Sequence, residues 1–205
     1  MAVVVVISGR GSNLQALLDA DIPVAAVVSN VAGAGGLMIA ERRGIPTATV
    51  PHKDYATREA FEDVLMRAID AYSPTLVAHA GFMRIVTAGY VRHYAGRSLN
   101  IHPSLLPSFT GLHTHERALA AGVKLHGCSV HFVTEELDGG PIVAQAAVPV
   151  LPGDTAKSLA GRVLKQEHFL YPRAVRWFLD GKLELDNGRV FQRDRDAQFV
   201  FSDQP

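Results

Sequence analysis

VVVVISGRGSNLQALL, residues 3–18, is the stretch that decides the fold we expect. Its five branched apolar residues, Val3 to Ile7, have the composition of a strand buried on both faces, as in a parallel sheet flanked by helices. The residues from Asn13 to Leu18 have helical spacing, and Ser12 or Asn13 is a good capping residue. The sequence therefore predicts a strand, a glycine loop and a helix in succession.

The same alternation continues as far as Gly122. Strands are predicted at 24–28, 46–50, 75–80 and 98–101, and helices at 38–43, 58–72, 86–94 and 115–121. Alternating strands and helices favour a parallel, right-handed, doubly wound sheet. We therefore predict the α/β class with a mostly parallel doubly wound sheet.

The pattern changes after Gly127. The runs 128–133 and 142–148 predict two strands whose connection is too short for a long helix, so we expect an antiparallel addition in the C-terminal third. Residues 155–178 have helical periodicity that is interrupted at Pro172, and 183–191 form a hairpin built on Asn-Gly. We expect a single domain over 1–192, followed by a loose polar tail over 193–205.

Composition excludes several classes of protein. The 205 residues contain 20 Lys plus Arg and 20 Asp plus Glu, so no sequence-wide basic field would hold nucleic acid or an anionic membrane. The single cysteine, Cys128, cannot form an intramolecular disulfide, which favours a reducing, cytoplasmic setting. No early apolar run approaches the ~20 residues of a membrane helix. We expect a soluble protein that binds any anionic ligand locally.

The loop from Gly9 to Asn13 joins the first predicted strand to the first helix. Glycines let backbone N–H groups approach an anion there, and the helix start adds partial positive charge, so phosphate is the natural ligand. The dinucleotide fingerprint fails because position 14 is Leu14 and the second strand ends at Asn30 rather than at an acid. No Walker lysine follows the loop, and a tight turn without a ligand remains an equal alternative.

Asn100 and His102 form the second candidate site. Residues two apart on an extended chain project to the same side, and these two fall at the end of a predicted parallel strand. An amide donor beside an imidazole suits a reaction in which a carbonyl oxygen becomes negative, although both could simply satisfy loop backbone. Asp138, followed by two glycines, is either part of a plain turn or an anionic partner that favours the imidazolium form of His102.

Two further patterns involve titratable side chains. Glu167 lies four residues after Val163 and three before Leu170, which places a carboxylate on the apolar face of the predicted helix. It forms either an internal salt bridge or a contact to a ligand amine or hydroxyl. The His113 and His115 pair lacks a third ligand at a suitable spacing, so we do not predict a metal site.

Taken together, five motifs closely resemble the phosphoribosylglycinamide formyltransferase family of purine biosynthesis. They are Gly9–Leu14, Ala80–Ile85, Asn100–Pro107, Gly127–His131 and Leu137–Ile142, and their order and spacing match from Val3 to about Lys182. The resemblance implies a sheet of the formyltransferase type. It also implies that 10-formyltetrahydrofolate, as co-substrate, donates its formyl group to the amine of glycinamide ribonucleotide through a tetrahedral oxyanion, without a metal.

The resemblance also implies roles for individual residues. Asn100, His102 and Asp138 would be catalytic, and His131 would support them. The residues implied to bind the ribonucleotide are Gly11, Ser12, Asn13, Lys165, Gln166 and Glu167. Those implied to bind the folate are Arg58, Met83, Arg84, Ile85, Val86, Asn100, Thr134, Glu135, Glu136, Leu137 and Asp138.

Some features depart from the family pattern or leave alternatives open. His79 stands where the family usually carries an apolar residue, and Leu164 replaces a residue that is often polar or basic. Another folate enzyme, such as a methionyl-tRNA formyltransferase or a formyltetrahydrofolate hydrolase, is the closest alternative, and a non-catalytic phosphoribosyl-binding module is a third. We expect small-molecule partners, neither nucleic acid nor a membrane, and a possible homodimer.

Overall fold

The computed structural model describes residues 1–202, which fold as two compact units. The first unit contains residues 1–100 together with 133–135, and the second contains 101–132 and the chain from 136 onward. Strand β5 (Ser98–His102) begins in the first unit, and its last two residues belong to the second. A single domain that ends at residue 192 stays a prediction.

The first unit is built on a parallel sheet. Its strands, in the order β3-β2-β1-β4-β5, are all parallel to their neighbours. They are β1 (Val3–Ile7), β2 (Val24–Ser29), β3 (Thr47–Thr49), β4 (Leu76–His79) and β5. The helices are α1 (Ser12–Asp19), α2 (Gly35–Arg42), the short 3₁₀ helix η1 (His52–Asp54), α3 (Arg58–Asp70) and α4 (Ala88–His93). The predicted alternation of strands and helices is confirmed.

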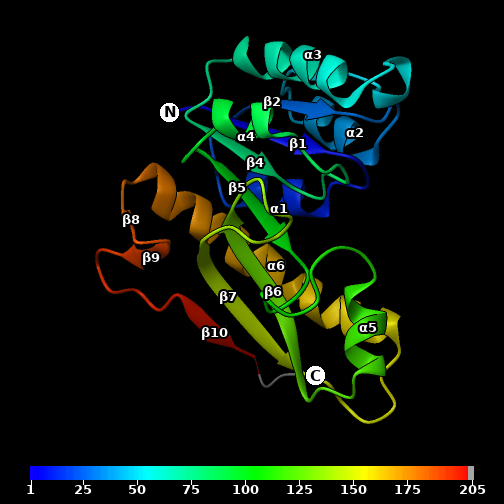
Figure 1. The fold of residues 1–205 in the computed structure, drawn as a ribbon, viewed down its shortest axis with the longest axis vertical. Coiled ribbons are helices and arrows are strands. Elements are labelled where there is room, and N and C mark those ends of the chain that lie inside the picture. Colours follow the sequence, from blue (N-terminus) through cyan, green and yellow to red (C-terminus); the bar gives the residue numbers. More distant parts are fainter. Residues whose placement is uncertain (203–205) are drawn as a thin grey trace. The chain divides into compact units, whose positions relative to one another are not determined.

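Helices cover both faces of β1, whose five residues are fully buried. Val4 and Val6 pack in one apolar cluster with Phe61 of α3 and with residues of α4, and Figure 1 shows both helices beside this sheet. Ile7 points to the opposite face, where a Cβ added at Gly36 of α2 would lie 2.5 Å from its Cδ1 atom. The run of branched residues is therefore buried on both sides, as a doubly wound sheet requires.

The second unit contains the antiparallel addition. Strand β6 (Leu125–Phe132) pairs antiparallel with β7 (Ile142–Pro149), and β10 (Phe199–Phe201) pairs parallel with β7. Helix α6 (Ala156–Leu179) lies along β6 and β7, and α5 (Thr114–Ala120) belongs to the same unit (Figure 1). Strands β8 (Leu183–Asp186) and β9 (Arg189–Gln192) form the predicted hairpin. Its turn residues, Asn187 and Gly188, both have positive φ, as a type I′ turn requires.

Three details differ from the sequence predictions. Gly11, in the left-handed conformation, is the N-cap of α1, and neither Ser12 nor Asn13 caps it. Helix α6 continues through Pro172 because buried residues on both sides of the proline keep packing, which outweighs one lost backbone hydrogen bond. Residues 199–201 of the polar tail form a strand rather than a loose segment.

Two further predictions concern Cys128 and the membrane. Cys128 is a buried free thiol, and burial raises its pKa well above the ordinary value. Among residues 1–202, no helix has both the length and the apolar character that a membrane crossing needs.

Candidate active site

A buried carboxylate lies between two buried imidazoles in the second unit. Nδ1 of His102, at the end of β5, is 3.4 Å from Oδ2 of Asp138, and both side chains are 8% exposed. Nε2 of His131, near the end of β6, is 3.7 Å from the other carboxylate oxygen. The structure thus brings together three residues that the sequence analysis singled out separately.

The loop over 109–111 contacts both members of the His102–Asp138 pair. The carbonyl oxygen of Phe109 lies 3.1 Å from Nε2 of His102, and the N–H of Gly111 donates to Oδ2 of Asp138 at 2.8 Å. Phe109 and Asp138 both have positive φ, with values of 57° and 53°. Left-handed backbone is uncommon for such residues, so these hydrogen bonds compensate a local conformational cost.

The two neighbours of His102 constrain its protonation state. A carboxylate faces Nδ1 and a carbonyl faces Nε2, and both groups are acceptors. A neutral imidazole donates from one nitrogen only, whereas an imidazolium donates from both. Only the imidazolium form of His102 can donate to both of these neighbours at once. The pKa of His131, by contrast, is lowered by burial, which outweighs its backbone hydrogen bond to Phe132 and the nearby Asp138 charge.

Asn100 lies on β5 two residues before His102 and is half-buried. Alternation along the strand directs both side chains to the same side of the chain, as the sequence spacing predicts. On the neighbouring strand β4, His79 pairs in register with Asn100. The carboxamide of Asn100 is therefore positioned by the sheet itself rather than by a loop.

The glycine loop of the first unit is tightly packed. Gly11 has φ of +82°, and a Cβ added there would lie 2.5 Å from the Cα of Gly36, so only glycine fits. Ser12 and Asn13 begin α1, which no side chain caps among the described residues. The first N–H groups of this helix are therefore disposed to bind an anion.

The loop over 81–87 is fastened to the end of β1. Ser8 accepts a hydrogen bond from the N–H of Met83 at 2.8 Å and donates to Asn30 at 2.6 Å, an anchor that the sequence analysis missed. Met83 and Ile85, on either side of Arg84, expose 68% and 52% of their surface and so present two large apolar side chains to solvent. Val86 is half-buried.

Among the predicted folate-binding residues, the two arginines differ. Arg58 begins α3 and is exposed, whereas Arg84 is half-buried. The Nε atom of Arg84 is buried and lacks a hydrogen-bond partner within residues 1–202. A buried donor of this kind normally has a partner, which makes Arg84 the better candidate for a ligand contact.

The predicted loop over 134–138 is divided between the two units. Thr134 is half-buried in the first unit, where exposed Glu135 forms an ion pair of 3.4 Å with Arg92. Glu136 and Leu137 are exposed in the second unit. Asp138, the last residue predicted in this loop, is the one described above beside the buried histidines.

The three residues of α6 that were predicted to bind the ribonucleotide do not share one face of the helix. Glu167 is 8% exposed, as its place on the apolar face predicts, while Gln166 is half-buried and Lys165 is exposed. Residues two apart on a helix do not face each other. Lys165 and Glu167 therefore point away from one another.

A second pair of histidines was missed by the sequence analysis. His126 of β6 is 1% exposed, and its Nε2 lies 3.2 Å from Nδ1 of His115. The ring of Phe109 packs edge-on against His126. Burial, together with the neighbouring His115 and His102, lowers the pKa of His126 to about 4, so this pair is neutral at pH 7.

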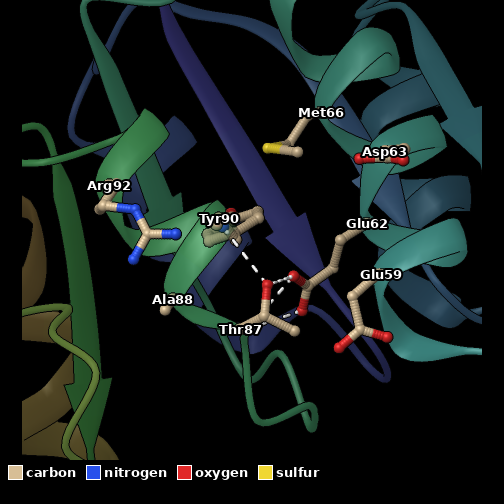
Figure 2. Close-up of a pocket in the computed structure, with 9 residues that line it drawn as sticks. Glu59, Glu62, Asp63, Met66, Thr87, Ala88, Tyr90 and Arg92 are labelled. Carbon is tan, nitrogen blue, oxygen red and sulfur yellow. Dashed lines mark hydrogen bonds between the residues drawn. The ribbon is translucent and has the colours of Figure 1, made fainter.

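The first unit also holds a pocket of about 370 Å³ that none of the predicted site residues line. Figure 2 shows the carboxylate of Glu62 directed at Thr87, the N-cap of α4, whose N–H and hydroxyl both donate to it. Burial raises the pKa of Glu62. Its carboxylate is thus engaged in holding the start of α4.

Comparisons with known proteins place the chain in a family. A family model described as formyl transferase matches residues 1–175. The chain belongs to the formyl transferase family. Across residues 1–202, no group of three or more His, Cys, Asp or Glu side chains is arranged to hold a metal ion.

Several family members with similar sequences and structures are phosphoribosylglycinamide formyltransferases. The phosphoribosylglycinamide formyltransferase of Escherichia coli (strain K12) is 52% identical over 191 residues, which is 90% of each chain. The solved structure of that enzyme from Coxiella burnetii has a TM-score of 0.92 at 45% identity and covers 98% of this chain and 99% of that one. The structure from Anaplasma phagocytophilum has a TM-score of 0.93 at 44% identity and covers 99% of both.

Proposed function

We propose that this protein transfers the formyl group of 10-formyltetrahydrofolate to the amine of glycinamide ribonucleotide, a step of purine biosynthesis. The observation that carries the proposal is the buried His102–Asp138 pair, with Asn100 two residues earlier on the same strand. Three relatives of similar length are named phosphoribosylglycinamide formyltransferases. Their shared name supports the choice of acceptor, and the geometry supports the chemistry.

The reaction requires no covalent bond to the protein. The substrate amine nitrogen attacks the formyl carbon on N10 of the folate, and the carbonyl oxygen becomes an alkoxide. The amide of Asn100 would donate to this oxygen, and the positive charge of His102 would stabilise it. The carbon–N10 bond then breaks, N10 takes a proton, and the former amine loses one.

His102 is suited to this role because its imidazolium form can donate to both of its neighbours. The carboxylate of Asp138 would compensate the charge of that form, and the Phe109 carbonyl would accept a hydrogen bond from Nε2. A developing oxyanion is a stronger acceptor than a neutral carbonyl, so it would compete for that proton. We infer that His131 supports the site by lining the buried carboxylate of Asp138, since its Nε2 lies 3.7 Å from Oδ1.

The binding roles follow from local chemistry. The N–H groups at Gly11, Ser12 and Asn13 would take the ribonucleotide phosphate at the uncapped start of α1. Glu167 would take the glycinamide amine or a ribose hydroxyl, as a buried carboxylate that can accept from either. The exposed position of Lys165 makes it the weakest member of this set.

The folate would contact the two loops predicted for it. Exposed Met83 and Ile85 offer apolar surface to a flat ring, and the buried Nε of Arg84 is a donor for its acidic tail. Arg58 and residues 134–137 complete the proposed set. We further propose a cytoplasmic location and small-molecule partners, and a homodimer stays a prediction.

A formyl transfer assay tests the function directly. The purified protein is mixed with 10-formyltetrahydrofolate, and formation of tetrahydrofolate is followed spectrophotometrically with glycinamide ribonucleotide, with methionyl-tRNA, or with no acceptor. Turnover only with glycinamide ribonucleotide is expected. Turnover with the tRNA, or release of formate without an acceptor, would favour one of the other folate enzymes. Binding of the ribonucleotide without turnover would favour the non-catalytic module.

A further inference from the structure

A buried polar cluster lies in the first unit beside Asn100. Nε2 of His79 on β4 is 3.0 Å from the hydroxyl of Tyr90 on α4 and 3.1 Å from the hydroxyl of Ser98 on β5. These three side chains are 4%, 0% and 3% exposed. The surrounding apolar cluster consists of aliphatic and aromatic residues such as Val6, Phe61 and Phe82.

Strand register makes this cluster the direct neighbour of Asn100. His79 and Asn100 are paired residues of the parallel strands β4 and β5, so their Cβ atoms point to the same face. Ser98 precedes Asn100 by two residues and shares that face. The link from His79 to Ser98 therefore joins the two strands one pleat before the carboxamide.

His79 also contacts the loop over 81–87 and the helix α4 that follows it. Its ring packs edge-on against Phe82 at a centroid distance of 5.5 Å. Tyr90, its second hydroxyl partner, lies in the first turn of α4, next to the N-cap Thr87 that Glu62 holds (Figure 2). One imidazole thus links β4, β5, α4 and the loop proposed to bind folate.

Packing alone does not explain a histidine here. A leucine would fill a similar volume among these apolar neighbours without any polar atom to satisfy, whereas the imidazole requires hydrogen-bond partners when buried. The two hydroxyl groups beside Nε2 belong to Tyr90 and Ser98, and each would otherwise also be a buried polar atom. Such a network specifies one arrangement of the elements that it joins.

We propose that His79 is a positioning residue for formyl transfer, which fixes the end of β5 so that the carboxamide of Asn100 faces the developing oxyanion. The proposal rests on the proposed function, because it assigns Asn100 a part in that reaction. A displacement of a catalytic group by about 1 Å can lower a rate about 100-fold, so a partial loosening of β5 is expected to cost about tenfold.

The test compares three substitutions of His79 in the full-length protein. His79→Leu removes the polar atoms and is expected to lower kcat about tenfold while KM for glycinamide ribonucleotide stays within about twofold. His79→Gln places an amide near the position of Nε2 and should restore most of kcat. His79→Asn reaches only the position of Nδ1 and should not restore it.

Two hydroxyl deletions keep the proposal testable if His79→Leu does not fold. Ser98→Ala and Tyr90→Phe each remove one partner of Nε2, and each should lower kcat by about threefold, less than additively when combined. Tyr94→Phe is the matched control. Tyr94 is 1% exposed and lies in the same cluster, but its hydroxyl donates to Asp70, so its loss should leave kcat unchanged.

The outcomes separate this proposal from the proposed function. If the unsubstituted protein does not transfer formyl to glycinamide ribonucleotide, the proposed function fails and this inference fails with it. If that protein is active but His79→Leu folds and keeps its full kcat, only the positioning role is overturned. Equal kcat in the Gln and Asn variants would also overturn it. A lower melting temperature with unchanged kcat would show a purely structural histidine.

Discussion

Two buried histidine clusters in the second unit have the same kind of side chain and different neighbours. At one, His102 faces the carboxylate of Asp138 and the carbonyl of Phe109. At the other, His126 faces His115 and an aromatic ring, and its pKa falls to about 4. Phe109 belongs to both, since its carbonyl meets His102 and its ring meets His126. The two imidazoles therefore differ in the groups that face them, with two acceptors at His102 and a second imidazole at His126.

Removal of each histidine gives the largest expected contrast. His102→Ala should lower kcat/KM for formyl transfer by at least about 100-fold, because it deletes a charge stabiliser and proton donor. Binding of glycinamide ribonucleotide, measured by calorimetry, should be largely retained. His126→Gln is the control and should stay within about threefold of the original activity. Equal losses in the two variants would erase the distinction between the clusters.

Neutralising the carboxylate should have the next largest effect. Asp138→Asn keeps an oxygen that can accept from the N–H of Gly111 but removes the negative charge beside His102. We expect kcat to fall by about 10- to 100-fold with little change in melting temperature. An unchanged kcat would show that the carboxylate acts only as a loop anchor.

Because the folded protein keeps His126 neutral, its stability should depend on pH. The pKa of His126 is about 4 in the folded protein and about 6.5 when unfolded, so below pH 6.5 the unfolded chain binds a proton that the folded chain does not. Its contribution to stability is present above pH 6.5 and is lost as the pH falls toward 4. Urea unfolding should show that the free energy of unfolding drops by about 2 kcal/mol less between pH 7 and pH 5 in His126→Gln. Identical slopes would contradict a neutral His126.

The sequence predicted those features that side-chain pattern encodes. The run Val3–Ile7 identified β1 with its observed bounds, and the spacing of Asn100 and His102 placed both on one strand. Glu167 was expected on the buried face of α6 and lies there. The information came from a continuous branched apolar run, from a spacing of two residues on a strand and from a helical period of 3.6 residues.

Features that depend on backbone geometry or on distant packing were not predictable. The Phe109 carbonyl and the Gly111 N–H reach the site because the loop adopts left-handed backbone, and every residue type carries the same backbone groups. Pro172 normally ends a helix, yet tertiary packing keeps α6 continuous. Strand β10 lies in a polar tail whose three-residue pattern is too short to recognise.

The central claim is that acceptors face both ring nitrogens of His102, whereas His126 is neutral at pH 7. Nitrogen NMR of protein with ¹⁵N-labelled histidine, assigned through the His102→Ala and His126→Gln variants, reports the protons on each ring. At pH 7 we predict a proton on only one ring nitrogen of His126, and we predict that Asp138→Asn changes the nitrogen signals of His102 but not those of His126. Protons on both ring nitrogens of His126, or His102 signals that Asp138→Asn leaves unchanged, would contradict the account.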